Sequence, residues 1–389
     1  MKERTKLIAS GRPRKKPSHP VNPAVERAST YLFPTYDDYV EGGRKIVYGR
    51  LGGPTHRALE ETVTALEGGV ETRLAPSGLQ AVNAAILAFV KAGDRVLMTD
   101  SAYDPTRKFC ERFLARFGVE TVFYNPLIGV DIADLMAPNV KVVFAESPGS
   151  LTFEVQDLPA LAKAAHAGGA KLIVDNTWAA GVFLKPLALG ADVVVQAGTK
   201  YLSGHSDCLI GTITSADEDA AKAIYHSLLQ IGSNVSADDA ALTLRGMRTL
   251  SVRMREHERT ALTLAKWLSK RPEVETVLHP AMKTCPGHQI WKRDFAGSSG
   301  LFGVVLKPVP LAQLKAFFNS LRFFGMGFSW GGYESLCIHV RPEQNRSATP
   351  WNAEGPVLRI HAGLEDSDDL IADLERAFAM MKTSKGAAG

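Results

Sequence analysis

Apolar positions between residues 53 and 211 follow two alternating patterns. Segments 62–68 and 78–94 repeat apolar residues at the spacing of one helix face, which predicts helices. Short apolar runs rich in β-branched residues predict buried strands: 95–100, 140–147, 170–176 and 191–198. Helices that alternate with buried strands indicate an α/β domain, with a mostly parallel sheet covered by helices on both faces.

The chain on either side of this region follows other patterns. The first residues are rich in Pro, Arg and Gly and show weak periodicity, while a long helical region begins near Asp238 and is followed by strands among helices. We therefore predict three parts: an N-terminal arm, 1–52; a ligand-binding α/β domain, 53–246; and a smaller α+β domain, 247–389. The last boundary is expected inside the long helix, near Gly246.

Composition and charge narrow the class of protein. The 389 residues are 45% apolar and 22% charged, as in a globular protein with two domains. The net charge is only +4 and the basic residues are scattered except in the run 11–16, so nucleic acid is not an expected partner. We interpret that run as a solvated arm and expect the first twenty residues to become ordered only on oligomer assembly.

The cysteines and the apolar runs bear on the compartment. No signal peptide and no apolar run of bilayer length is found, so no membrane contact is expected. The four cysteines are widely separated and lack the spacing of a metal site, so no metal is expected: Cys110, Cys208, Cys285 and Cys337. Reduced core thiols of this kind predict a cytoplasmic protein.

Candidate chemistry lies where the predicted strands end. Asp175 ends one strand, and Lys200 follows the next strand after Gly-Thr. Ligands of open α/β sheets bind beyond these strand ends, and a lysine partly desolvated there has a lowered pKa and attacks carbonyl groups more readily. Ser77 and Gly78 open a helix whose free N–H groups suit a phosphate.

A lysine, a carboxylate and a phosphate site are the parts that pyridoxal 5'-phosphate requires. The carboxylate would keep the pyridine nitrogen protonated, and the lysine amine would attack the aldehyde. Spacing alone also allows a plain N-cap at Ser77, and a structural ion pair between Lys200 and Asp175.

Ordered motifs from about Asn22 to the final helix resemble the Cys/Met-metabolism family of PLP-dependent enzymes. They are "YGRLGGPTH", "SGLQA", "SAYDPTRKFC", "FAESPGS", "VDNTWAAG", "GTKYLSGHSD", "WKRDFAGSSGLF", "SWGGYESL" and "RIHAGLEDSDDLI". The resemblance implies the aspartate-aminotransferase-like fold, fold type I, with a large, mostly parallel sheet domain and a smaller C-terminal α+β domain. It also implies a homotetramer, a dimer of dimers with shared active sites.

The resemblance further implies cofactor roles for individual residues. Lys200 matches the Schiff-base lysine, which later carries protons, and Asp175 matches the partner of the pyridine nitrogen. Tyr103 matches the aromatic residue stacked on the cofactor ring. Phosphate contacts are implied within one subunit for Gly78, Leu79 and Thr199, and from the neighbouring subunit for Tyr48 and Arg50.

Substrate contacts are implied near the C-terminus, with Tyr48 in addition. Arg359 matches the arginine that clamps the substrate α-carboxylate, and Ser329 and Trp330 match its substrate loop. Phe328 and Trp330 replace a Glu and a Leu common in γ-acting relatives, which removes a charge suited to a second ammonium. The expected reaction is therefore β-elimination of L-cystathionine, an amino-acid thioether, to homocysteine, pyruvate and ammonia, a step of methionine biosynthesis.

Two alternatives remain. One is another reaction of the family, as a cystathionine γ-lyase or γ-synthase, a methionine γ-lyase or a broad cysteine-S-conjugate β-lyase. The other is a non-catalytic binding module, which would have no need of Lys200, Asp175, Tyr103 and Arg359 together. Two departures from the family pattern are Ala197, where many relatives carry serine, and Ser150, where γ-acting relatives carry asparagine.

Overall fold

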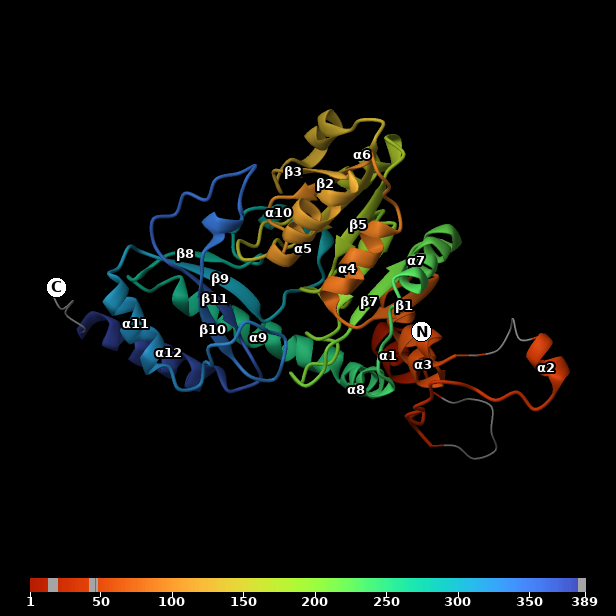
Figure 1. Cartoon of the computed structure of the whole chain (residues 1–389). Helices are drawn as coiled ribbons and strands as arrows, with labels where there is room; N and C mark the ends of the chain where they lie inside the picture. Colours follow the sequence, from red (N-terminus) through yellow and green to blue (C-terminus); the bar gives the residue numbers. More distant parts are fainter. Residues whose placement is uncertain (13–19, 42–45, 47, 384–389) are drawn as a thin grey trace.

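The computed structural model describes residues 1–12, 20–41, 46 and 48–383. Figure 1 shows a large half built around one sheet, a smaller half built around another, and an N-terminal segment that carries α2 (Tyr36–Val40) away from both. Most of the predicted basic run lies outside the described residues. The division into domains at residue 246 stays a prediction.

The large half contains a seven-stranded sheet in the order β1-β7-β6-β5-β4-β2-β3. Its strands are β1 (Glu71–Ala75), β2 (Arg95–Thr99), β3 (Glu120–Tyr124), β4 (Val140–Glu146), β5 (Lys171–Asp175), β6 (Val193–Ala197) and β7 (Gly211–Ser215). Only β7 runs against its two neighbours, and the other neighbouring pairs are parallel. The predicted mostly parallel sheet is confirmed.

Helices cover both faces of this sheet. They are α3 (Pro54–Glu67), α4 (Gly78–Leu87), α5 (Asp104–Lys108), α6 (Leu158–Ala167), α7 (Glu218–Gln230) and α8 (Ala237–Met247). Alternate residues of β6 enter different buried clusters: Val194 packs with the α6 side, and Val193 and Val195 pack with the α4 side. Burial on both faces explains why the strands are continuous apolar runs.

The helix predicted over 78–94 is wrong at its end, because α4 stops at Leu87. The Asp94 carboxylate accepts a hydrogen bond from the Lys91 N–H at 2.9 Å. Gly93 has a φ of +89°, which turns the chain into β2. The turn formed by Gly93 and Asp94 therefore ends the helical region, although the residues before it keep the spacing of a helix.

The smaller half is a four-stranded antiparallel sheet in the order β10-β11-β9-β8, which confirms an α+β arrangement. Its strands are β8 (Val274–Leu278), β9 (Leu301–Leu306), β10 (Leu336–Val340) and β11 (Val357–His361). Its helices are α9 (Leu250–Leu268), α10 (His288–Asp294), α11 (Leu311–Ser320) and α12 (Ser367–Thr383). The predicted single long helix is instead two, α8 and α9, separated at Arg248 and Thr249.

The N-terminus differs from the expectation. Helix α1 (Glu3–Ala9) is formed within one chain, with Leu7 buried in the same apolar cluster as Leu59 of α3. Arg248 donates to the Leu7 carbonyl at 2.5 Å and to the Ser10 carbonyl at 2.9 Å. Ordering on oligomer assembly is therefore wrong for α1, because its own chain supplies the apolar cover. Residues 13–19 lie outside the described part of the chain.

Candidate active site

Lys200 lies one tight turn beyond the carboxyl end of β6. Its N–H donates to the Ala197 carbonyl at 3.0 Å, which closes the turn. The Nζ amine donates to the Ser329 hydroxyl at 2.8 Å and lies 5.3 Å from the centroid of the Trp330 ring. Burial, followed by the nearby Arg359 cation, lowers the pKa of Lys200 to about 8 against the attraction of Asp175. The lowered lysine pKa expected at this strand end is confirmed.

Asp175 ends β5, beside β6. Its Oδ1 accepts from both the N–H and the hydroxyl of Thr177, at 2.9 and 2.5 Å, and the Thr177 hydroxyl also accepts from the Ala197 N–H. Burial raises the pKa of Asp175, against these hydrogen bonds and Lys200. Within the described residues no ion pair joins Asp175 to Lys200, so the structural ion-pair alternative is wrong. The geometry suits a protonated ring nitrogen, which would favour the charged carboxylate.

Glu146 is a neighbour of Asp175 that the sequence reasoning missed. It ends β4, and the parallel register pairs its Cα with that of Asp175. Its carboxylate accepts from the Tyr103 N–H at 2.7 Å. Burial, together with the charge of Asp175, raises the pKa of Glu146 well above its usual range. Both "FAES" and "IVDN" end predicted strands, but the sequence alone does not show that these two strands are neighbours in register.

Tyr103 caps α5 and has a side chain that is 48% exposed, unlike a core tyrosine. Burial of its hydroxyl, followed by the charge of Glu146, raises its pKa, and the positive charge of Arg359 opposes this effect. Tyr103 and Arg359 line the same small cavity of about 80 Å³. A ring that is half exposed beside a carboxylate pair is available for stacking on an aromatic cofactor.

The start of α4 suits a phosphate. Ser77 caps the helix by accepting from the Gln80 N–H at 3.1 Å, and the N–H groups of Gly78 and Leu79 precede the first intrahelical bond. A Cβ on Gly78 would lie 2.4 Å from that of Ala197, so glycine lets the helix start touch the end of β6. Thr199 holds the same turn through hydrogen bonds between its side chain and Ile210. The phosphate of the cofactor and its aldehyde, which the Lys200 amine attacks, would therefore bind at neighbouring positions.

Arg359 lies on β11 and holds the loop above Lys200. Its Nη2 donates to the Phe328 carbonyl at 2.8 Å and the Ser329 carbonyl at 3.1 Å. Burial lowers the pKa of Arg359 to about 10, which leaves it charged at neutral pH. Within the described residues no carboxylate pairs with it, so the guanidinium is available to a carboxylate ligand.

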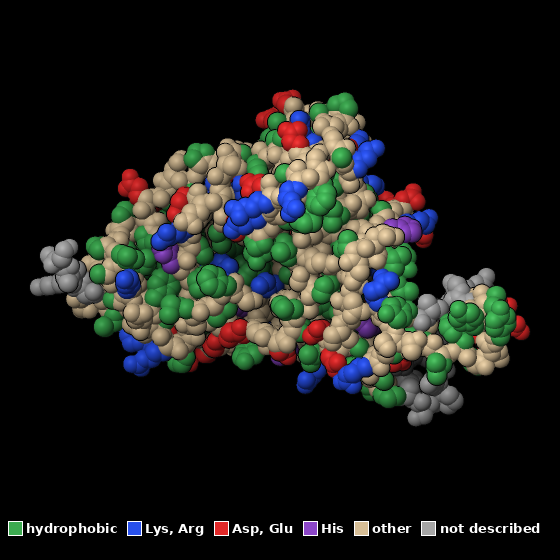
Figure 2. All heavy atoms as spheres, in the orientation of Figure 1, with side chains coloured by type: hydrophobic (Ala, Val, Ile, Leu, Met, Phe, Trp, Pro, Cys, Tyr) green, Lys and Arg blue, Asp and Glu red, His purple; other side chains and the backbone are tan. Residues whose placement is uncertain are grey.

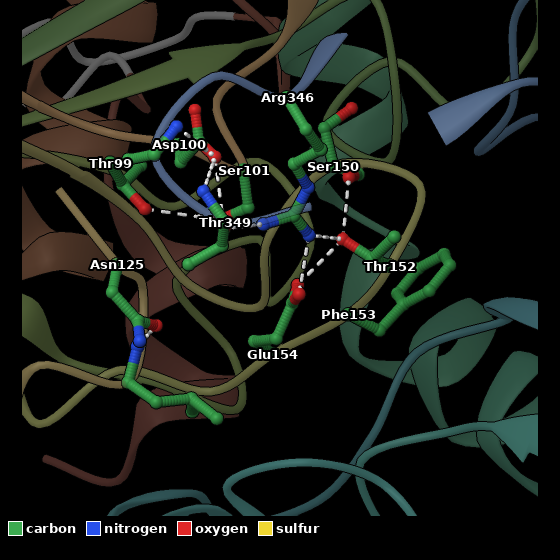
Figure 3. Close-up of polar contacts among 12 residues, drawn as sticks. Thr99, Asp100, Ser101, Asn125, Ser150, Thr152, Phe153, Glu154, Arg346 and Thr349 are labelled. Atoms are coloured by element: carbon green, nitrogen blue, oxygen red, sulfur yellow. Dashed lines mark hydrogen bonds and ion pairs between the residues drawn. The ribbon is translucent and has the colours of Figure 1, made fainter. Parts of the chain in front are cut away.

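A second loop of the smaller half is held beside Tyr103 by Asp100, which is fully buried at the end of β2 (Figure 3). Its carboxylate accepts from the N–H and hydroxyl groups of Ser347 and Thr349 and pairs with Arg107 at 2.8 Å. Burial alone would raise the pKa of Asp100, but these donors outweigh it and lower the pKa. Arg346, in the same loop, pairs with Glu154.

Tyr48 and Arg50 lie elsewhere. Arg50 donates to the Leu229 carbonyl of α7 at 3.3 Å, its guanidinium lies 5.9 Å from the Tyr48 ring centroid, and the Tyr48 side chain is 50% exposed. Within the described part of one chain, no contact brings either residue to Lys200. Their service to a neighbouring subunit stays a prediction.

Residues 4–379 match the protein family described as "Cys/Met metabolism PLP-dependent enzyme". The chain belongs to this family. It is therefore a PLP-dependent enzyme, with the fold type expected from the motifs. The residues present fit that cofactor: the start of α4 suits its phosphate, the Lys200 amine suits its aldehyde, and the Asp175 carboxylate suits its ring nitrogen.

Individual relatives are similar to this chain in sequence or structure along almost its whole length. Cystathionine beta-lyase of Salmonella typhimurium is 45% identical, covering 96% of this chain and 98% of the relative. Cystathionine beta-lyase of Haemophilus influenzae is 43% identical over 96% and 97%. The solved cystathionine gamma synthase of Xanthomonas oryzae in complex with cystathionine is 27% identical, covers 99% of this chain and 100% of its own, and superposes with a TM-score of 0.91.

Figure 2 shows basic, acidic and apolar side chains interspersed over one face. Among the helices of the described residues, none has the length and apolar character to cross a membrane.

Proposed function

We propose that this chain cleaves the Cβ–S bond of L-cystathionine, consuming water and releasing homocysteine, pyruvate and ammonia. The observation that carries the proposal is the placement of the Lys200 amine under an aromatic loop, beside Arg359, which has no carboxylate partner among the described residues. The beta-lyase names of the relatives with 43 and 45% identity support the same reaction.

Lys200 and Asp175 have separate roles in this reaction. Lys200 attaches the cofactor, and its amine, once displaced by the substrate, removes the Cα proton. When bound, pyridoxal phosphate supplies a conjugated ring that accepts the electron pair left on Cα. Asp175 keeps the ring nitrogen protonated, and Lys200 returns a proton to the leaving sulfur. A pKa of about 8 suits an amine that must exchange protons near neutral pH.

Arg359 and the loop above Lys200 orient the substrate. The guanidinium receives the α-carboxylate, while the Ser329 hydroxyl holds Nζ within reach of Cα. Tyr103 stacks on the ring, and the N-terminus of α4 with Thr199 holds the phosphate. Trp330 presents an aromatic face to Lys200. Phe328 stands where γ-acting relatives carry a glutamate that would attract a second ammonium, which favours β- over γ-cleavage.

The γ-acting alternative keeps some support from the cystathionine gamma synthase structure, which shares the fold at lower identity. A broad cysteine-S-conjugate β-lyase would use the same loop and the same Cβ–S cleavage. The aromatic loop favours both β-lyases over the γ-acting enzymes.

We further propose a cytoplasmic homotetramer with active sites shared between subunits. The N-terminal segment exposes apolar side chains that a partner would cover: Leu32 at 93%, Tyr36 at 76% and Tyr39 at 65% exposure. The projecting segment shows such side chains on its surface in Figure 2. All four cysteines are free and buried, which supports a reducing compartment.

The test uses two variants that fail for different reasons. Lys200→Ala should lose turnover because its site lacks the amine, and Arg50→Ala should bind the cofactor weakly because the partner's phosphate contact is gone. Mixed and reassembled oligomers should recover part of the activity if Arg50 serves the neighbouring site. Turnover retained by Lys200→Ala would exclude the proposed chemistry, and no recovery on mixing would exclude shared sites.

A further inference from the structure

Two buried histidines, His361 and His257, lie behind the loop that covers Lys200. Both are at most 1% exposed, and their ring centroids are 5.2 Å apart. The Tyr201 ring packs against both histidines and against Trp330. The proposed reaction uses neither imidazole as an acid or base. The hydrogen bonds of His361 nevertheless reach the backbone of the loop.

The loop contacts are specific. His361 Nε2 lies 3.1 Å from the Gly331 nitrogen and 3.1 Å from the Gly332 carbonyl oxygen. Gly331 has a φ of +87°, and a Cβ there would lie 2.9 Å from the Lys200 carbonyl carbon. The loop backbone is therefore packed directly on the backbone of Lys200. Any shift of this glycine pair displaces Ser329 and Trp330 relative to Nζ.

One ring nitrogen cannot serve both loop groups. A neutral Nε2 either accepts from the Gly331 N–H or donates to the Gly332 carbonyl. A buried N–H without an acceptor is rarer and costlier than a carbonyl with an unused lone pair. This preference assigns the acceptor role to Nε2 and places the proton of His361 on Nδ1. Burial, followed by the charge of His257, lowers the pKa of His361 well below its usual value, in keeping with a neutral ring.

His257, which packs beside His361, also carries its proton on Nδ1. Its Nδ1 lies 2.8 Å from the Ala362 carbonyl oxygen and must donate to it, so its Nε2 carries a lone pair. Burial, opposed by that carbonyl and reinforced by Arg253, lowers the pKa of His257 to about 4. Within the described residues two nitrogens of these rings are buried without a partner: His361 Nδ1 and His257 Nε2. With the protons assigned in this way, His361 Nδ1 carries a proton and His257 Nε2 carries a lone pair.

We propose that His361 is a positioning residue for the substrate loop, with its Nε2 accepting from the Gly331 N–H and its proton on Nδ1. This hydrogen bond joins the end of β11 to the loop, and the Tyr201 ring packs between the histidines and Trp330. Together these contacts hold the loop that carries Ser329 and Trp330 at a set height over Lys200. The claim that the loop position affects turnover rests on the proposed function, whereas the proton assignment of His361 does not.

The tautomer is tested without substrate. A neutron structure of the holoenzyme, after exchange into heavy water, should show deuterium on Nδ1 of both histidines. Deuterium on His361 Nε2 would overturn the assignment whatever the enzyme catalyses.

The positioning role is tested by three variants assayed as holoenzymes with L-cystathionine. His361→Leu leaves the Gly331 N–H unpaired and should lower kcat/KM by about 10- to 100-fold, the effect of one buried unsatisfied donor. His361→Gln restores a polar group that can accept from the Gly331 N–H and should recover about tenfold of that loss. No rescue by glutamine would overturn the positioning role.

His279→Leu is the matched control. His279 is also fully buried with a lone Nε2, and its Nδ1 accepts from the Ala281 N–H at 3.1 Å, but it packs on Phe302 in the smaller sheet. It should lose thermal stability with no change in kcat/KM. Equal losses of kcat/KM in His279→Leu and His361→Leu would show that His361 acts only through core packing, and would overturn its positioning role. If the wild type itself fails to cleave cystathionine while the neutron result holds, the proposed function fails and the tautomer stands.

Discussion

Replacing Lys200 with methionine should abolish turnover and yet stabilise the cofactor-free fold at neutral pH. Burial, followed by Arg359, lowers the pKa of Lys200 from 10.5 to about 8. Such a lowering costs about 3 kcal/mol of folding free energy where the unfolded amine is charged. Loss of the bond to Ser329 offsets about 1 kcal/mol, and partial solvent exposure reduces the cost further. We expect K200M to gain about 1–2 kcal/mol at pH 7.

The sign of this effect depends on pH. The folded pKa lies below the unfolded one, so the cost to the wild type is full below pH 8 and declines between pH 8 and 10.5. Above that range both states hold the neutral amine and the cost vanishes. K200M should therefore be more stable than the wild type near pH 7 and slightly less stable above pH 10.5, where only the lost hydrogen bond remains.

Urea unfolding of the cofactor-free proteins at both pH values measures the difference. Lys171→Met is the control, because Lys171 starts the same sheet's β5 and its pKa is raised. Burial alone would lower that pKa, but Asp192 and Asp217 outweigh it. Lys171→Met should lose stability at neutral pH. A K200M protein no more stable than the wild type at pH 7, or a gain that is unchanged at high pH, would refute the reasoning.

Three further predictions follow from the site and its supports. Arg359→Lys should raise KM for the substrate by about 100-fold with a smaller change in kcat in steady-state assays, because an ammonium cannot make the two parallel hydrogen bonds of a guanidinium; an unchanged KM would remove Arg359 from the carboxylate site. Asp100→Asn should cost about 3–5 kcal/mol in urea unfolding at pH 7, because the buried Arg107 loses its close charge partner and is left with the partly exposed Glu111 at 3.7 Å. Since the pKa of Asp100 is lowered, the difference should shrink as pH falls through that pKa, and a pH-independent difference would contradict the charge argument. Thr177→Val should weaken PLP binding by about tenfold in absorbance titrations, because Asp175 loses a hydrogen bond and the Ala197 N–H loses its acceptor; unaltered affinity would show that Thr177 does not support Asp175.

The sheet and its strand-end chemistry could be predicted from the sequence because both are local signals. A strand buried on both faces is a continuous apolar run, so Asp175 and Lys200 are recognisable as polar residues at the ends of such runs. The motifs then supplied Arg359 and the Ser329 loop, which lie far from Lys200 in sequence. Periodicity could not give the end of α4, where a turn held by Asp94 takes over from the helical spacing.

Other site residues were beyond reach because their roles arise across elements. Glu146 matters through its register with Asp175 and its bond to the Tyr103 backbone, and neither is encoded in nearby residues. His257 and His361 meet only when α9 packs against β11. Their sequence contexts, "REHER" and "RIHAG", carry no sign that the two rings pack together behind the loop.

Product analysis of the PLP-loaded protein with L-cystathionine tests the central claim most directly. The assay separates pyruvate from 2-oxobutyrate and homocysteine from cysteine, so it reports which C–S bond breaks. The site at Lys200, whose loop carries Phe328 and Trp330 and no carboxylate, predicts pyruvate and homocysteine in equal amounts with ammonia. Release of 2-oxobutyrate and cysteine would contradict the account and identify a γ-lyase.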